Sequence, residues 1–102
     1  MTFAIRNDAQ AGLLHLEGTF TFDGHAAFKT ATSALLETGG FPAFILDLSG
    51  VAYMDSAALG MLLLLRERAQ ARGMQVVLSR PTPPVAAILQ VVQFGKLFEI
   101  HR

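Results

Sequence analysis

Ala43-Phe44-Ile45-Leu46-Asp47-Leu48 is the stretch that decides the fold, together with the segments that follow it. Its nearly continuous apolar character is typical of a strand covered on both faces, as parallel strands beneath crossover helices are. We expect a loop over residues 49–54, a helix over residues 55–72 and a second strand over residues 75–79. Strand, helix and strand at this spacing form a βαβ unit, in which a right-handed crossover joins two parallel strands.

Two strands and a helix are expected before this unit. Residues 3–5 and 14–20 alternate apolar and polar side chains, which predicts two strands that form a hairpin. The period then changes to that of a helix, with Asp23 as the expected N-cap and Gly39-Gly40 as the stop. The apolar stripe of this helix is formed by Ala27, Phe28, Ala31, Ala34, Leu35 and Thr38.

A third helix and a final strand are expected after the unit. The prolines of residues 81–84 cannot continue a ladder but suit a helix start, so residues 85–92 predict a helix. Phe94-Gly95 ends it, and residues 96–100 predict a short strand. The element order is therefore ββαβαβαβ, which is typical of one α/β domain over residues 1–102 with a mixed sheet of about five strands.

Composition excludes several classes of function. The formal net charge of zero provides no field that would attract nucleic acid or an anionic membrane. The absence of cysteine removes disulfides, thiolate zinc sites and thiol nucleophiles. The longest apolar stretch, residues 57–65, is far shorter than the roughly 20 residues that span a bilayer, so we expect no membrane insertion. Residues 1–8 carry no secretory signal pattern, and we expect a cytoplasmic protein.

Ser56 is the strongest candidate functional residue. The segment from Met54 to Gly60 lies where the carboxyl end of the central strand turns into a helix N-terminus, and free backbone N–H groups and the helix dipole there favour negative charge. A phosphate on Ser56 would add almost two negative charges without unfolding the helix. The simpler alternative is that Asp55 or Ser56 is only a helix cap. A nucleophile elbow is disfavoured, because Met54 and Ala58 replace the glycines of G-x-S-x-G.

The helix after Ser56 is apolar nearly all round in its first half, so some of its side chains must point away from the sheet. Packing against the preceding helix explains most of them, and Met61 and Leu64 are the candidates for an exposed docking ridge. The arginines near its end suit the negative end of the helix dipole.

The remaining polar residues predict no metal, nucleotide or catalytic site. The histidines are scattered: His15, His25 and His101. No pair of them has the i, i+4 spacing of a metal site, and no glycine-rich phosphate-binding motif occurs. Three aspartates fall on separate elements: Asp8, Asp23 and Asp47. Their separation in sequence gives no ground for a catalytic carboxylate pair.

The chain resembles the STAS domain family, the anti-sigma factor antagonists of bacterial partner-switching systems. The resemblance covers nearly the whole chain and is carried by Gly18, the helix end before Gly39, residues 44–49, Tyr53-Met54-Asp55-Ser56, Leu59-Gly60, Gly73 and residues 94–100. It implies the family's fold, with helices packed mainly on one face of the sheet.

The resemblance also implies a mechanism in signal transduction and transcription regulation. The unmodified antagonist binds an anti-sigma factor that is also an ATP-dependent serine kinase, and so frees the sigma factor. Phosphorylation of the serine after the motif aspartate, here Ser56 after Asp55, dissolves the complex, and a metal-dependent serine phosphatase resets it. The ATP belongs to the partner, so the resemblance implies that this chain needs no cofactor and is not an enzyme.

The implied partner-binding residues surround Ser56: Thr21, Asp23, Asp55, Ser56, Ala57, Ala58, Gly60 and Met61. Two departures from the family's common pattern occur among them. Ala57-Ala58 replaces Ser-Gly, and Thr21 stands where an acidic residue is frequent. The Ala57-Ala58 pair favours the alternative, in which the chain is a STAS scaffold or sensor component of another signalling assembly without serine phosphorylation.

Overall fold

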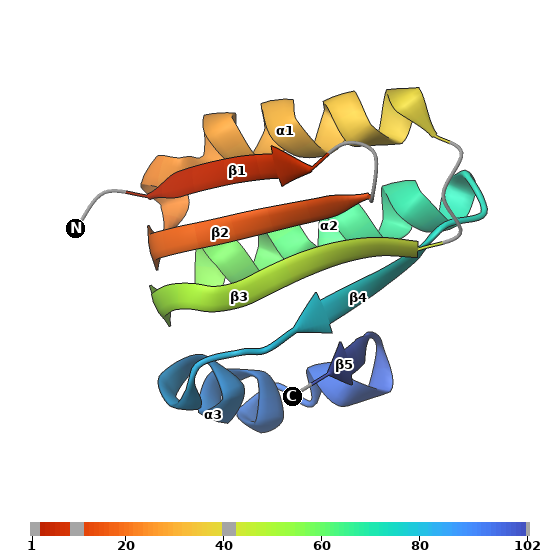
Figure 1. Ribbon diagram of the computed structural model, residues 1–102. Coiled ribbons are helices and arrows are strands. Elements are labelled where there is room, and N and C mark those ends of the chain that lie inside the picture. The colour runs from red at the N-terminus through yellow and green to blue at the C-terminus, as the bar shows by residue number, and fades with distance from the viewer. Residues whose placement is uncertain (1–2, 9–11, 40–42, 102) are drawn as a thin grey trace.

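A computed structural model describes residues 3–8, 12–39 and 43–101. The elements follow one another in the predicted order ββαβαβαβ, with two short 3-10 helices, η1 and η2, between them (Figure 1). They are β1 (Ala4–Asp8), β2 (Leu13–Phe20), η1 (Phe22–Gly24), α1 (His25–Thr38), β3 (Ala43–Met54), α2 (Ser56–Ala71), β4 (Gln75–Ser79), α3 (Pro83–Val91), η2 (Phe94–Lys96) and β5 (Glu99–His101). None of the described helices has the length and hydropathy needed to cross a membrane.

The five strands form one mixed sheet in the order β1-β2-β3-β4-β5. β1 and β2 are antiparallel, which confirms the predicted hairpin, and the remaining neighbours are parallel. β3 lies at the centre, and α2 connects it to the parallel strand β4, as predicted for the βαβ unit. The corner where β3 passes into α2 therefore stands at the carboxyl edge of the sheet.

The core lies between the sheet and the helices on one of its faces. Figure 1 shows α1 and α2 side by side behind the strands, with α3 along the lower edge. Buried side chains alternate along the strands, as with Leu14 and Leu16 on β2 and Phe44 and Leu46 on β3. Each large apolar side chain buried in this way contributes roughly 1.5–3 kcal/mol to folding. The fold class predicted from the sequence, with helices mainly on one face, is confirmed.

Residues 49–54 form part of β3, so the prediction of a loop there was wrong. Ser49 and Gly50 resemble a turn signal, yet β2 is long enough to keep pairing with β3 as far as Met54. The register shifts on β2 between His15 and Glu17, and Gly50 lies opposite Glu17. A Cβ on Gly50 would lie 2.9 Å from the Glu17 Cγ atom, so the close approach of the two strands requires glycine here.

The first helix begins later than predicted. Asp23 lies in η1, and the N-cap of α1 is Gly24, so the expectation that Asp23 caps this helix was wrong. The physical reason is that the chain first makes a 3-10 turn, which places Gly24 against the Phe3 ring. Gly39, with φ 63°, ends α1 as expected.

The buried stripe of α1 also differs from the predicted one. It consists of Phe28, Thr32, Leu35 and Leu36, and Ala27 and Ala34 are exposed. Thr32 is tolerated in the core because its hydroxyl donates a hydrogen bond to the Phe28 carbonyl oxygen at 2.8 Å.

At the C-terminal side the third helix and the last strand are shifted from the predicted bounds. α3 begins at Pro83 instead of residue 85, and β5 begins at Glu99 instead of residue 96. The chain between them turns through η2, where Phe94 and Phe98 are buried with ring centroids 5.3 Å apart.

Candidate functional site

Ser56 is the first residue of α2 and is exposed to solvent. β3 ends at Met54, and Asp55 between the two elements has an extended backbone with φ −99°. The structure therefore confirms that the Asp-Ser pair lies at the start of a helix. Within the described part of the chain, no hydrogen bond holds the Ser56 hydroxyl.

Asp55 is the N-cap, and its carboxylate holds two segments together. The Oδ1 atom accepts a hydrogen bond from the Ala58 N–H at 2.8 Å, which satisfies one of the free donors of the first turn. The Oδ2 atom accepts one from the Phe22 N–H at 3.2 Å, across 33 residues of sequence. Asp55 is therefore the helix cap, and the Ser56 hydroxyl is not used for capping.

Two exposed aromatic residues are connected to the start of α2: Phe22 through its backbone hydrogen bond to Asp55, and Tyr53 as the second residue before Asp55 in the chain. Phe22 is 68% exposed, and its backbone N–H donates a hydrogen bond to Asp55. Tyr53 is 49% exposed and is the last residue but one of β3. Most large apolar side chains of this chain are buried, and exposed aromatics grouped around a polar residue are typical of protein-binding surfaces. We call Phe22, Tyr53, Asp55 and Ser56 the Ser56 corner.

The other residues expected to bind a partner differ in exposure. Thr21 and Ala57 are half-buried, and Asp23 and Gly60 are exposed. Ala58 is fully buried and Met61 is 7% exposed, so their side chains support the surface from beneath. Leu64, one turn after Gly60, is 54% exposed and is the member of the expected ridge that reaches solvent.

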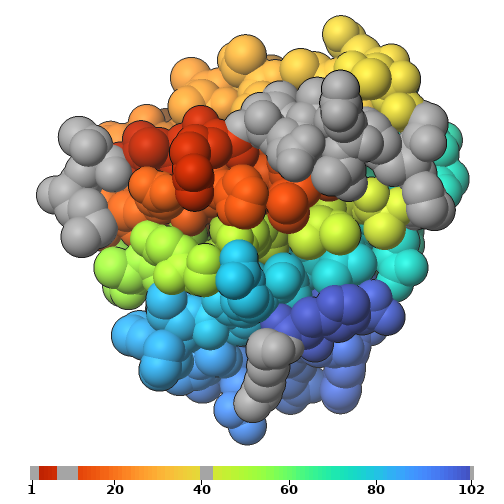
Figure 2. Space-filling view, viewed as in Figure 1, coloured from red at the N-terminus to blue at the C-terminus, as the bar shows by residue number. Residues whose placement is uncertain are grey.

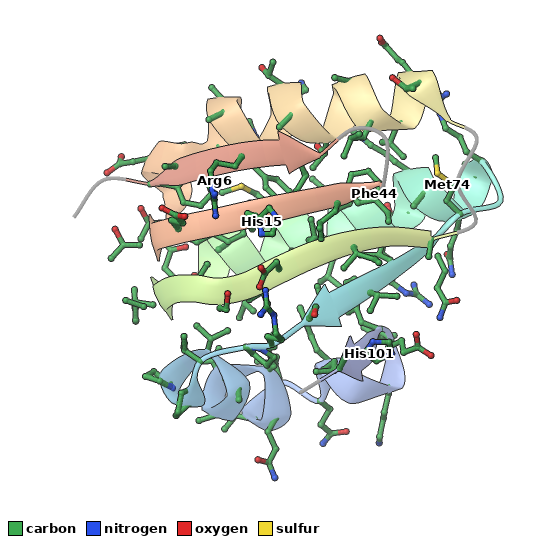
Figure 3. The ribbon with its side chains drawn as sticks, in the orientation of Figure 1. Arg6, His15, Phe44, Met74 and His101 are labelled. Carbon is green, nitrogen blue, oxygen red and sulfur yellow. The ribbon has the colours of Figure 1, made fainter. Side chains whose placement is uncertain are left out.

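The face of the sheet turned away from α1 and α2 carries a polar cluster that the sequence did not predict. Asp47 is nearly buried on β3, and its Oδ2 atom accepts hydrogen bonds from His15 Nδ1 at 2.7 Å and from the Arg80 guanidinium. Figure 3 shows His15 and Arg6 on this face, and in the space-filling view residues of β2, β3 and β4 reach the surface there (Figure 2). The pairing register places His15 opposite Asp47, and Arg80 reaches the same carboxylate from the position directly after β4.

The hydrogen bonds around Asp47 decide its ionisation. Burial alone would raise the pKa of this carboxyl, but hydrogen bonds from the Ser49 backbone and side chain, His15 and Arg80 outweigh it and lower the pKa from 3.8 to about 2. Asp47 is therefore a carboxylate at neutral pH. It ties β2 and the end of β4 to the central strand.

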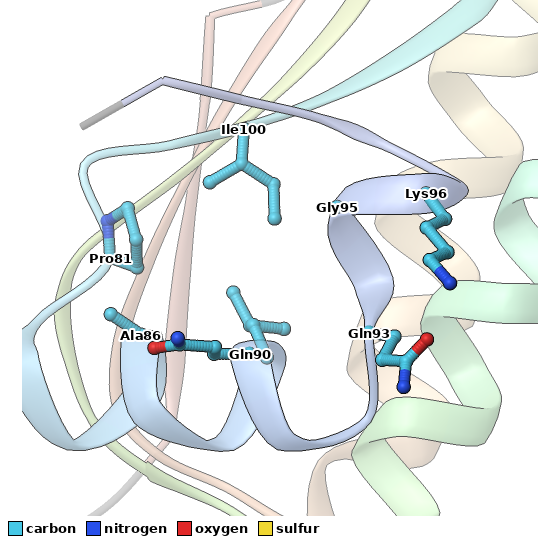
Figure 4. Close-up of a pocket in the computed structure, with 8 residues that line it drawn as sticks. Pro81, Ala86, Gln90, Gln93, Gly95, Lys96 and Ile100 are labelled. Carbon is cyan, nitrogen blue, oxygen red and sulfur yellow. The ribbon is translucent and has the colours of Figure 1, made fainter.

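The hollow beneath α3 does not have the features of a polar ligand site. It measures about 280 Å³ and is lined mainly by apolar side chains, among them Pro81, Leu89 and Ile100. Figure 4 shows Ile100 pointing into it, whereas the Lys96 side chain points away. Within the described ranges, no group of three or more histidine, aspartate or glutamate side chains could hold a metal ion.

Comparison with known families identifies the chain. The family model described as "Mlab, STAS domain" matches residues 3–99. The chain belongs to the STAS domain family. A STAS-domain containing protein of Pseudomonas aeruginosa (strain UCBPP-PA14) is 37% identical over 93 residues, which are 91% of this chain and 90% of the relative.

Solved STAS structures share the fold at low sequence identity. An anti-sigma factor antagonist from Mycobacterium paratuberculosis superimposes with a TM-score of 0.76 at 21% identity, covering 98% of this chain and 84% of that chain. The Bacillus cell fate determinant SpoIIAA in its phosphorylated form gives a TM-score of 0.68 at 16% identity, covering 97% and 90%. The solved structures that share this fold thus include a protein described as an anti-sigma factor antagonist.

Proposed function

We propose that this STAS domain is an anti-sigma factor antagonist whose binding surface is the Ser56 corner and whose switch is phosphorylation of Ser56. The observation that carries the proposal is the exposed Ser56 at the first position of α2, directly after Asp55, whose carboxylate binds the backbone of the exposed Phe22. The unphosphorylated domain binds an anti-sigma factor that is also a serine kinase, and the kinase brings its own ATP.

The local geometry supports a switch that acts without refolding. A phosphate on Ser56 lies at the positive end of the α2 dipole, where negative charge is tolerated. Asp55 keeps its two backbone hydrogen bonds, because they do not involve Ser56. The dianion must however be desolvated if a partner covers the two aromatic rings, and an unpaired buried charge costs several kcal/mol of binding. Phosphorylation therefore removes affinity and leaves the fold intact.

The residues that depart from the family pattern, Thr21 and the pair Ala57-Ala58, differ in their exposure to solvent. Ala58 is fully buried, so its replacement of glycine changes the core side of the helix. Ala57 and Thr21 are half-buried at the rim of the corner and are the positions at which partner selectivity is expected to differ.

The proposal is tested with the cognate kinase, ATP and mass spectrometry. Phosphate is expected on Ser56 of the wild type, none on Ser56→Ala, and unchanged labelling of Ser33→Ala, a control serine on α1. Ser56→Asp is expected to lose the kinase complex, whereas Ser56→Ala forms a complex that ATP no longer dissolves. A wild type that binds a partner but accepts no phosphate, with Ser56→Asp binding equally well, would favour the scaffold alternative.

A further inference from the structure

A groove between α1 and α2 starts next to the Ser56 corner. His25 lines the groove, and its ring stacks on that of Phe22 with centroids 6.0 Å apart, so the groove and the corner form one continuous surface. The floor of the groove is apolar, built from Phe28, Met61 and the 54% exposed side chain of Leu64. The hollow itself measures about 170 Å³. Ligand pockets usually measure about 300–1,000 Å³, so this hollow suits an anchoring side chain better than a small molecule.

The rim of the groove is basic. Lys29 on α1 and Arg68 on α2 line it and are exposed. Among the described residues neither of them forms an ion pair, in contrast to Arg6 and Arg80 on the sheet.

No acidic side chain is among the described residues that line this groove. Glu37 lines the next hollow along the helix pair together with Arg68 and Arg72, and two arginines beside one carboxylate leave a positive balance. The chain as a whole has no net charge, so the groove is a local concentration of unpaired cations over an apolar floor.

We propose that this groove binds an acidic amphipathic helix of the partner protein. The groove extends from His25 to Thr32 on α1 and from Met61 to Arg68 on α2, which at about 1.5 Å per residue is roughly 10 Å, or two helical turns. A helix laid into it presents apolar residues at i, i+3 or i+4 and i+7 to the floor. Because Lys29 and Arg68 stand on different helices, the bound helix carries carboxylates on both flanks of its apolar stripe.

The acidic helix is assigned to the protein that docks at the Ser56 corner, and in this one respect the inference rests on the proposed function. The charge pattern selects the partner and the apolar floor anchors it, while the phosphate on Ser56 acts at the neighbouring end of the same surface.

The test uses the full chain and two helical peptides stapled to hold their conformation. Both have leucines at i, i+3 and i+7; one carries glutamates on the two flanks of the stripe and the other carries lysines. Binding is followed by amide NMR shifts of the labelled protein. The glutamate peptide is expected to perturb α1 and α2 and to bind at least about tenfold more tightly than the lysine peptide. The double variant Lys29→Glu/Arg68→Glu is expected to reverse this preference.

Matched variants separate the groove from general effects of charge and hydrophobicity. Lys96→Glu changes an exposed lysine beside the α3 hollow and should leave the affinity unchanged. Leu64→Ser should weaken binding about tenfold or more, whereas Val91→Ser, at an 81% exposed position on α3, should not. Thermal melts establish that each variant is folded.

Equal affinities for the two peptides, no binding of either, shifts confined to other elements, or an equal effect of Lys96→Glu would each overturn the assignment. The assay contains neither kinase nor ATP. Its failure would therefore leave phosphorylation of Ser56 standing, and an unphosphorylated Ser56 would leave binding of the peptide standing.

Discussion

Replacing Asp47 by asparagine should remove about 2 kcal/mol from the free energy of unfolding at neutral pH, and this loss should fade in acid. The folded-state pKa of Asp47 is lowered from 3.8 to about 2 by its hydrogen bonds, which outweigh burial. One pKa unit is worth about 1.4 kcal/mol, so the carboxylate contributes about 2 kcal/mol when it is ionised in both states.

The direction of the pH dependence follows from the lowered pKa. As the pH falls, the unfolded chain takes up the proton first, so the stabilisation is complete above about pH 4 and is lost as the pH falls toward about 2. Asp47→Asn has no such carboxylate at any pH. The difference in unfolding free energy between wild type and variant should therefore shrink between pH 5 and pH 2, whatever constant offset the asparagine amide adds.

Urea unfolding followed by circular dichroism is the suitable assay, because the chain has no tryptophan and a single tyrosine. Glu17→Gln is the matched control: its ion pair with Arg6 spans exposed side chains and should contribute at most about 1 kcal/mol. A difference between wild type and Asp47→Asn that stays constant from pH 6 to pH 3 would refute the reasoning about this cluster.

Three further substitutions test the corner and the strand that leads to it. Asp55→Ala should lose about 1 kcal/mol, and up to about 2, of unfolding free energy because the α2 cap is removed; an unchanged denaturation midpoint would contradict the role given to it. Gly50→Ala brings a Cβ within 2.9 Å of the Glu17 side chain and 3.0 Å of the Leu16 carbonyl oxygen, and should cost about 1–3 kcal/mol, visible as a lower Tm. Tyr53→Ser should change stability by less than about 0.5 kcal/mol but weaken partner binding about tenfold or more in calorimetry, and full affinity would remove Tyr53 from the interface.

The parts of the fold that the sequence predicted are those set by local periodicity. Alternation along β2, the buried run of β3 and the Asp-Ser pair before an apolar helix each depend on neighbours in sequence, and each lies where expected. Two of the wrong predictions, the loop after Leu48 and the Asp23 cap, show what local patterns miss. Ser49-Gly50 reads as a turn but pairs with β2, and Asp23 reads as a cap but lies in a 3-10 turn.

The polar cluster around Asp47 could not be predicted, because His15 meets Asp47 through strand register and Arg80 joins from the position directly after β4. A shift of one residue would turn His15 to the opposite face of the sheet, and the irregularity after His15 makes the register impossible to count from the sequence. Arg80 reaches the cluster from a left-handed backbone conformation, φ 51°, which is rare for this residue type. The alternation of residues 14–20 was a usable signal for the face on which the His15 side chain lies, but it named no partner.

The exposure of Phe22 was equally hidden. It belongs to a short turn before α1 and enters the Ser56 corner only through the hydrogen bond from its N–H to Asp55. The sequence thus predicted Ser56 as the candidate switch residue and offered Asp55 or Ser56 as the cap, and the structure assigns the cap to Asp55 and adds the exposed Phe22 and the basic groove.

The most direct test of the proposal that a charge at the start of α2 controls docking compares two affinities of the kinase. One is for protein that carries phosphoserine at position 56, and the other is for unmodified protein. Calorimetry without nucleotide measures both values, and thermal melts of the two forms establish that the fold is the same. We expect the phosphorylated form to bind about 100-fold more weakly while melting at nearly the same temperature. Equal affinities, or a loss of binding that accompanies unfolding of α2, would contradict the proposed switch.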